Sequence, residues 1–184
     1  MRYQSIKNIE KEFLEPSFQY LVENGLENTS VRDLCKAMNI SYGSLYYWFS
    51  GKDDIYTSVV EYGLGKAVKK LFSSVYEKFA DLELFFSTFL DDVDKCTEDI
   101  RVVFQFATSI DYGNVVRNKM QEFNGMYREY AEELSEKVGA SVEDMAPFIY
   151  LLISVVSDYV IWQDRPATEM QMKFLYKGMT PLRK

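Results

Sequence analysis

The stretch "TSVRDLCKAMNISYGSLYYWF", residues 29–49, contains two short helical patterns separated by a tight turn. In the first pattern, Ser30 and Asp33 have the spacing of a capping box, and the apolar side chains that follow recur at helical intervals. Asn39 is suited to end this helix, because asparagine tolerates the left-handed backbone conformation. We therefore expect a helix that begins after Thr29 or Ser30 and ends at Asn39.

The second pattern begins at Ser41, whose hydroxyl can cap a helix. Leu45 and Phe49 are four residues apart and are expected to point inward together, and Gly51 is expected to stop the helix. Two helices joined by a turn of three to four residues form the helix-turn-helix pattern. The exposed face of the second helix is expected to carry aromatic and hydroxyl side chains and one glycine, namely Tyr42, Gly43, Ser44, Tyr46 and Tyr47.

A further helical pattern precedes these two, over about residues 5–24. Pro16 lies inside it and lacks a backbone donor, so we expect a kink there or a helix that starts afresh near Glu15. Gly25 is expected to end this helix in the left-handed conformation. Residues 1–52 are therefore predicted to form a three-helix domain.

Apolar residues recur at helical rather than strand spacing in the rest of the chain, so we predict an all-α fold. Residues 53–184 are expected to form a second, larger helical domain. Gly63 and Gly65 lie inside its first helix, either as a hinge or without a particular role. Longer helices are predicted at about 54–79, 82–97, 98–110, 114–138, 142–163 and 168–179.

The composition excludes several classes of function. The chain has no histidine, so histidine-based catalysis and most transition-metal sites are excluded, and it has no glycine-rich phosphate loop. Its two cysteines, Cys35 and Cys96, are too far apart for a CxxC zinc site and too few for a disulfide framework. We expect no enzyme, no cofactor and no metal, although a carboxylate-based active site would escape this reasoning.

The distribution of charge and hydropathy bears on the compartment and the partners. The apolar run between Asp144 and Asp158 is shorter than the ~20 residues of a membrane-spanning helix, and residues 1–25 are too charged for a signal peptide. We therefore expect a soluble, cytoplasmic protein with no membrane partner. Of the net charge of −7, none lies in residues 1–52, which hold six basic and six acidic side chains. Because the excess charge lies in residues 53–184, it does not argue against nucleic-acid binding by the first domain.

Residues 9–56 resemble the DNA-binding domain of the TetR family of transcriptional regulators. The family motif runs approximately from "LF…G" through "T(S/T)V..IA..AGVS.G.LY.YF..K..L", and residues 20–55 read "YLVENGLENTSVRDLCKAMNISYGSLYYWFSGKDDI". The match covers about a quarter of the chain. The positions in register with the motif are Gly25, Thr29, Val31, Leu34, Ile40, Ser41, Gly43, Leu45, Tyr46, Phe49 and Lys52.

This resemblance implies that the helix after Ser41 enters the major groove of double-stranded DNA. Hydroxyl groups suit phosphate contacts, and the glycine at position 43 lets the backbone approach closely. A packed core helix is the alternative for residues 41–52, and the place of Trp48 is open between the core and DNA. The predicted DNA contacts are Thr29, Ser30, Ser41, Tyr42, Gly43, Ser44, Tyr46, Tyr47, Trp48 and Lys52.

The resemblance also implies that residues 53–184 are a helical ligand-binding and dimerisation domain, with a cavity for an effector among its helices. Aromatic walls with a few carboxylates suit a hydrophobic or cationic small molecule. The candidate ligand-binding residues are Phe86, Phe89, Phe104, Phe123, Tyr127 and Asp158.

Asp158 lies in the segment "FIYLLISVVSDYVIW", residues 148–162, which is apolar on every face and is expected to be covered on all sides. The carboxylate is therefore expected to be buried, with a protein cation, a hydrogen bond across a dimer or a ligand as its partner. Asp91, Asp92 and Asp94 are expected to lie on a solvated loop rather than in a metal site.

We thus predict a homodimeric transcriptional regulator, a ligand-responsive repressor whose last two helices pair across a two-fold axis. Its two recognition helices are expected to bind a palindromic operator. The alternative is an all-helical adaptor that uses the three-helix domain to bind protein and does not bind DNA.

Overall fold

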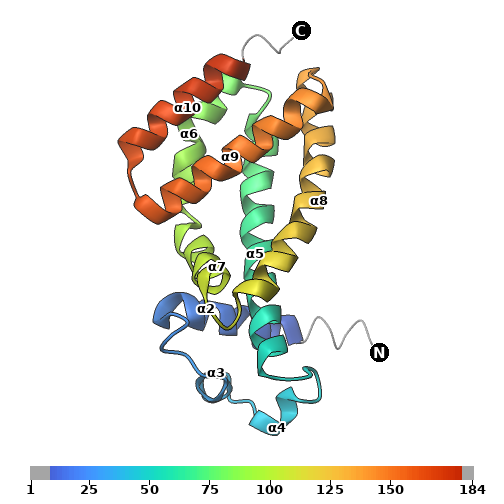
Figure 1. Cartoon of the computed structure of the whole chain (residues 1–184), viewed down its shortest axis with the longest axis vertical. Coiled ribbons are helices and arrows are strands. Elements are labelled where there is room, and N and C mark those ends of the chain that lie inside the picture. The colour runs from blue at the N-terminus through green and yellow to red at the C-terminus, as the bar shows by residue number, and fades with distance from the viewer. Residues whose placement is uncertain (1–8, 180–184) are drawn as a thin grey trace. The chain divides into compact units, whose positions relative to one another are not determined.

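The computed structural model of the chain describes residues 9–179, apart from the side chains at positions 10, 115–117 and 119–127. Every secondary-structure element in the described part is a helix, so the predicted all-α fold is confirmed (Figure 1). The chain forms two compact units, of which the first joins the residues up to Ala67 to Glu98–Lys119. The second unit joins Val68–Thr97 to the residues from Met120 onward. The functional division after residue 52 stays a prediction.

The first unit begins with a π-helical turn, η1 (Glu10–Leu14), which leads into α2 (Glu15–Asn24). Pro16 lies in the first turn of α2. The assigned α-helix begins at Glu15, near the predicted position, but the backbone stays helical there, because Leu14 is in the right-handed helical conformation and η1 runs directly into α2. Gly25 ends α2 with a φ of 77°, in the region that favours glycine.

The helix α3 (Val31–Ala37) has the predicted capping box at its start. The backbone N–H of Asp33 donates to the Ser30 hydroxyl, and the Asp33 carboxylate accepts from the Ser30 backbone N–H at 3.0 Å. Asn39 follows the helix with a φ of 52°, as its residue type predicts.

The helix α4 (Tyr42–Leu45) is capped by Ser41, whose hydroxyl accepts from the backbone of Ser44 at 3.1 Å. This helix is a single turn and does not continue to Gly51, so its predicted length was wrong. The chain instead leaves it through hydrogen-bonded turns, with the N–H of Phe49 donating to the carbonyl of Leu45 at 2.9 Å.

The two side chains predicted to point inward from this segment are buried, Leu45 at 1% exposure and Phe49 at 8%. The Phe49 ring packs against Phe13 with ring centroids 5.7 Å apart. The helix-turn-helix segment is therefore anchored to the helices before it by apolar contacts as well as by caps.

The helix α5 (Lys52–Lys78) begins in the first unit, and its Gly63 lies close to the Phe18 ring of α2. A Cβ atom added at Gly63 would lie 2.0 Å from the Phe18 ring, whereas one added at Gly65 would meet nothing within 4 Å. Gly63 is therefore required by packing, a role that is neither a hinge nor incidental. The first unit also contains nearly all of α7 (Thr97–Thr108) and the start of α8 (Gly113–Val138).

The second unit is built around an aromatic core. It contains α6 (Leu82–Asp94), α9 (Val142–Trp162) and α10 (Arg165–Met179), and α10 packs against both α6 and α9 (Figure 1). Phe79 lies against Phe85 and Phe148, with ring centroids 5.1 and 5.5 Å apart.

One side of α9 is buried in this core and the other side is exposed. Asp158 lies on the exposed side, so nothing in the described part of the chain buries its carboxylate. Within that part α10 packs against α9, and the expected burial of Asp158 across a dimer or by a ligand stays a prediction. The helix α9 is long and apolar enough to cross a membrane, a property that core helices of soluble proteins share.

Acidic residues near the end of α6 form ion pairs, so the prediction of a solvated loop was wrong. Asp91 and Asp94 accept from Arg165 at 2.5 and 2.9 Å, which fixes the start of α10. Asp92 is buried and accepts from Ser74, Lys78 and Lys95. Among the described residues no group of three or more acidic or cysteine side chains could hold a metal ion.

Burial by itself would raise the pKa of Asp92. The hydrogen bonds from Lys78, Lys95 and Ser74 outweigh burial and lower the pKa from 3.8 to about 2. The folded state therefore favours the charged form of this carboxylate.

The two glycines of α5 allow a matched test of packing. Gly63→Ala is expected to lower the free energy of unfolding by about 1–3 kcal/mol, because the buried Phe18 ring must move to admit the methyl group. Gly65→Ala is expected to raise it by about 0.5–1 kcal/mol through helix propensity alone. Urea unfolding followed by circular dichroism measures both, and equal effects at the two positions would contradict the packing role.

Asp92→Asn is expected to lower the free energy of unfolding at neutral pH by about 2 kcal/mol, the equivalent of the lowered pKa. Because the folded-state pKa lies below 3.8, this contribution is complete above that pH and is lost as the pH falls toward about 2. Urea unfolding of both proteins across this range is the measurement. Glu83→Gln, at an exposed carboxylate of α6, serves as the control, and a pH-independent difference at position 92 would refute the assignment.

Candidate DNA-binding surface

The short helix α4 and the turn after it carry four exposed rings, which we call the aromatic surface. Tyr42, Tyr46 and Trp48 are 43%, 44% and 44% exposed, and Tyr47 is 84% exposed. The place of Trp48, which the sequence left open, is thus at the surface. Large rings at such exposure leave an amphipathic face that no described residue of the chain covers.

Two of these rings hold one another in place. The hydroxyls of Tyr42 and Tyr46 share a hydrogen bond at 2.7 Å, and the rings meet edge to face with centroids 5.1 Å apart. This hydrogen bond is the largest of the causes that raise the pKa of Tyr46 above 10, so the hydroxyl stays protonated and can donate. The pair therefore presents hydrogen-bonding groups from a fixed position.

The remaining predicted contacts on α4 are small and polar. The hydroxyls of Ser41 and Ser44 lie 2.5 Å apart beside the start of the helix. A Cβ atom added at Gly43 would meet no atom within 4 Å, so this position is open to an approaching molecule. The structure thus brings Ser41, Tyr42, Gly43, Ser44, Tyr46, Tyr47 and Trp48 together on one exposed segment.

Thr29 and Ser30 are used within the fold. The Thr29 hydroxyl donates to the carbonyl of Gly25 at 2.7 Å and its side chain is buried, while Ser30 caps α3. These two residues shape the turn before the helix-turn-helix, and a contact of their side chains with DNA stays a prediction.

Lys52 is exposed at the start of α5, with its ammonium 5.7 Å from the ring centroid of Tyr56 and 5.8 Å from that of Tyr112. A hydrogen bond with Tyr112 is the main cause that raises the pKa of Lys52, so the group is fully charged at neutral pH. Its contact with DNA also stays a prediction.

Sequence reasoning left out Arg32 and Lys36 as DNA contacts. Both are exposed on α3, and their spacing of four residues places them on one helical face.

The predicted ligand-binding residues do not gather in one described cavity. Phe86 lines a cavity of about 350 Å³ between α6 and α10, Phe89 is buried beside it on α6, and Phe104 lies on α7 in the first unit. The side chains of Phe123 and Tyr127 lie outside the described part of the chain. Asp158 is exposed on α9, as described above.

Comparison with known proteins agrees with this geometry. Residues 14–59 match the family described as bacterial regulatory proteins, tetR family. The uncharacterized HTH-type transcriptional regulator YfiR of Bacillus subtilis is 24% identical over 123 residues, which make up 67% of this chain and 58% of that protein. The matched part of the chain therefore spans little more than half the length of this relative.

Two solved structures share the fold over nearly their whole length. A TetR-family transcriptional regulator from Cytophaga hutchinsonii has a TM-score of 0.71 at 16% identity, with 96% of this chain and 95% of that chain covered. A transcriptional regulator of the TerR/AcrR family from Aquifex aeolicus has a TM-score of 0.57 at 22% identity, with 94% and 98% covered. The chain thus has both the N-terminal helix-turn-helix domain and the fold of a TetR-family transcriptional regulator.

Proposed function

We propose that the protein is a ligand-responsive transcriptional repressor that binds a palindromic operator as a homodimer. The observation that carries this proposal is the exposed aromatic surface on a capped helix-turn-helix segment. Such a protein works in the cytoplasm, without enzymatic activity, a membrane or a cofactor.

The chemistry of the aromatic surface suits the wall of a DNA groove. Tyrosine and serine hydroxyls donate to phosphate oxygens, and exposed rings pack on sugars and thymine methyl groups. The open backbone at Gly43 allows α4 to approach base edges. Arg32, Lys36 and Lys52 supply the positive charge that phosphate binding needs, on a chain whose net charge is −7.

Exposed apolar side chains on α9 and α10 support dimerisation. They are Tyr150, Leu151, Ile161, Trp162, Met170 and Phe174. Large apolar side chains exposed on two adjacent helices favour burial against a second copy, which would pair four helices across a two-fold axis. The two α4 helices would then face half-sites about one helical turn, ~34 Å, apart.

The cavity between α6 and α10 supports a hydrophobic or cationic effector. Phe86, Leu90, Met172 and Tyr176 provide apolar walls, and Glu83 and Glu169 provide carboxylates. A ligand changes operator affinity only if it binds the DNA-bound and the released conformations differently. Binding of such a molecule without any effect on operator affinity would remove the ligand response from the proposal.

Gly43→Leu is expected to weaken operator binding at least about 100-fold, because the new side chain stands between α4 and DNA. Folding is expected to be intact, since no protein atom lies within 4 Å of the added Cβ. Selection from a random duplex pool supplies the operator, and fluorescence anisotropy measures the affinity. Gly65→Leu, at an equally open position on α5, is the control.

A folded wild-type protein that retains no specific duplex would favour the all-helical adaptor instead. A palindromic motif among the retained duplexes would support the dimeric repressor. Equal operator binding by the Gly43→Leu protein and the wild type would place the DNA contact elsewhere.

Phe174→Glu is expected to convert the dimer into a monomer, because it places a charge in the centre of the paired apolar faces. Sedimentation equilibrium should give twice the 21.5 kDa chain mass for the wild type and the single mass for the variant. Ile110→Glu alters a side chain that is 99% exposed in the first unit and should stay dimeric. A monomeric wild type at micromolar concentration would refute this interface.

A further inference from the structure

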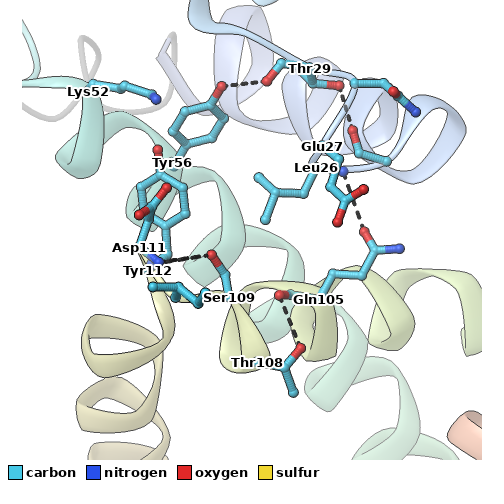
Figure 2. Close-up of a pocket in the computed structure, with 13 residues that line it drawn as sticks. Leu26, Glu27, Thr29, Lys52, Tyr56, Gln105, Thr108, Ser109, Asp111 and Tyr112 are labelled. Atoms are coloured by element: carbon cyan, nitrogen blue, oxygen red, sulfur yellow. Dashed lines mark hydrogen bonds between the residues drawn. The ribbon is translucent and has the colours of Figure 1, made fainter.

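The first unit contains a cleft of about 820 Å³, drawn in Figure 2. One wall comes from the turn that precedes α3 and from the start of α5, and the other comes from the end of α7 and the loop after it. Its volume lies within the range of small-molecule sites, about 300–1,000 Å³. Nothing proposed above occupies this cleft, which is separate from the effector cavity between α6 and α10.

The floor of the cleft is firmly built. The Tyr56 hydroxyl donates to the Thr29 carbonyl at 2.7 Å, and the Tyr56 ring packs against Tyr112 with centroids 5.2 Å apart. The Ser109 hydroxyl accepts from the backbone N–H groups of Asp111 and Tyr112. These bonds shape the cleft before any ligand arrives, so a ligand need not order it.

The lining is polar, unlike that of most small-molecule sites. Amide and hydroxyl side chains come from both walls, including Asn28, Gln105 and Thr108. The direct hydrogen bond between the walls runs from the Leu26 N–H to the Gln105 side chain and is long, at 3.4 Å. A polar molecule could therefore replace water in the cleft without leaving buried groups unpaired.

Opposite charges face the cleft from separate places. Lys52 stands at the start of α5 and Glu27 stands in the turn before α3, and Figure 2 shows them on different sides of the Tyr56 ring. Neither appears in an ion pair among the described residues. Asp111 also lines the cleft, and its charge is one of the causes that raise the pKa of Lys52. A ligand with a carboxylate at Lys52 and an ammonium group at Glu27 would meet the opposite charge at each end.

We propose that this cleft binds a small zwitterion of the amino-acid or short-peptide class. Its carboxylate pairs with Lys52, its ammonium group pairs with Glu27, and the amide and hydroxyl side chains of the walls bind its polar middle. Charge-assisted hydrogen bonds at both ends give the selectivity for a zwitterion.

Occupation of the cleft has a direct consequence for DNA. Lys52 belongs to the predicted phosphate contacts, so a carboxylate bound to it competes with a DNA phosphate for the same ammonium. The ligand therefore lowers operator affinity. This regulatory half rests on the proposed DNA-binding function, whereas the binding half does not.

The test begins without DNA. Thermal unfolding of the full chain is measured with each standard amino acid and with diglycine and triglycine, which place the two charges at increasing separation. At least one zwitterion is expected to raise Tm, and calorimetry then gives its affinity. The N-acetylated and the amidated forms of the same compound, each lacking one charge, are expected to bind at least about tenfold more weakly.

Variants locate the site. Glu27→Gln is expected to weaken the zwitterion at least about tenfold, while Glu23→Gln, an exposed acid on α2 outside the cleft, leaves its affinity unchanged. Absence of any Tm rise in the wild type, or equal binding of the singly charged forms, would overturn the proposed ligand class. Unchanged binding by the Glu27→Gln protein would overturn the site.

Operator affinity is measured last, with and without the zwitterion. A loss of affinity in the wild type that the Glu27→Gln protein does not show supports the regulatory half. A zwitterion that binds the cleft and leaves operator affinity unchanged overturns that half alone. If no operator is found, the proposed function fails, and the calorimetry still decides the binding half.

Discussion

The hydrogen bond from the Tyr56 hydroxyl to the Thr29 carbonyl, 2.7 Å long, fixes the helix-turn-helix segment to the helix that follows it. The Tyr56 ring is 2% exposed and lies against Phe106 and Tyr112, so the bond is buried. Burial raises the pKa of Tyr56 to about 12, which keeps the donated proton on the hydroxyl. An unpaired carbonyl there would cost about 1–3 kcal/mol, so this bond holds the turn before α3 to α5.

Much of the first unit could be predicted because its signals are local. Ser30, Asn39 and Ser41 act through hydrogen bonds or backbone angles within a few residues, and all three are where their chemistry predicts. The length of α4 was mispredicted, because the chain after Leu45 keeps its hydrogen bonds in tight turns that the apolar spacing cannot distinguish from a helix. The exposure of Asp158 could not be predicted either, since the cover of that side of α9 does not come from the described chain.

The candidate sites also differ in whether they depend on local or on distant residues. The aromatic surface comes from consecutive residues, so its exposure followed from the two inward positions of the segment, Leu45 and Phe49. The cleft could not be predicted, because its walls meet through residues 79 positions apart in the chain. The role of Gly63 likewise depends on Phe18, a partner on another helix. Where a residue's function depends on a distant partner, the spacing of its neighbours carries no signal of it.

The two tryptophans of the chain have a practical consequence. Trp48 belongs to the aromatic surface and is 44% exposed, and Trp162 lies on the exposed side of α9 at 76% exposure. An indole in contact with water emits at longer wavelength than one that a partner covers. The unlabelled protein therefore carries one optical reporter on each of its two exposed apolar surfaces, and replacing either indole by phenylalanine would let the emission of the other be followed alone.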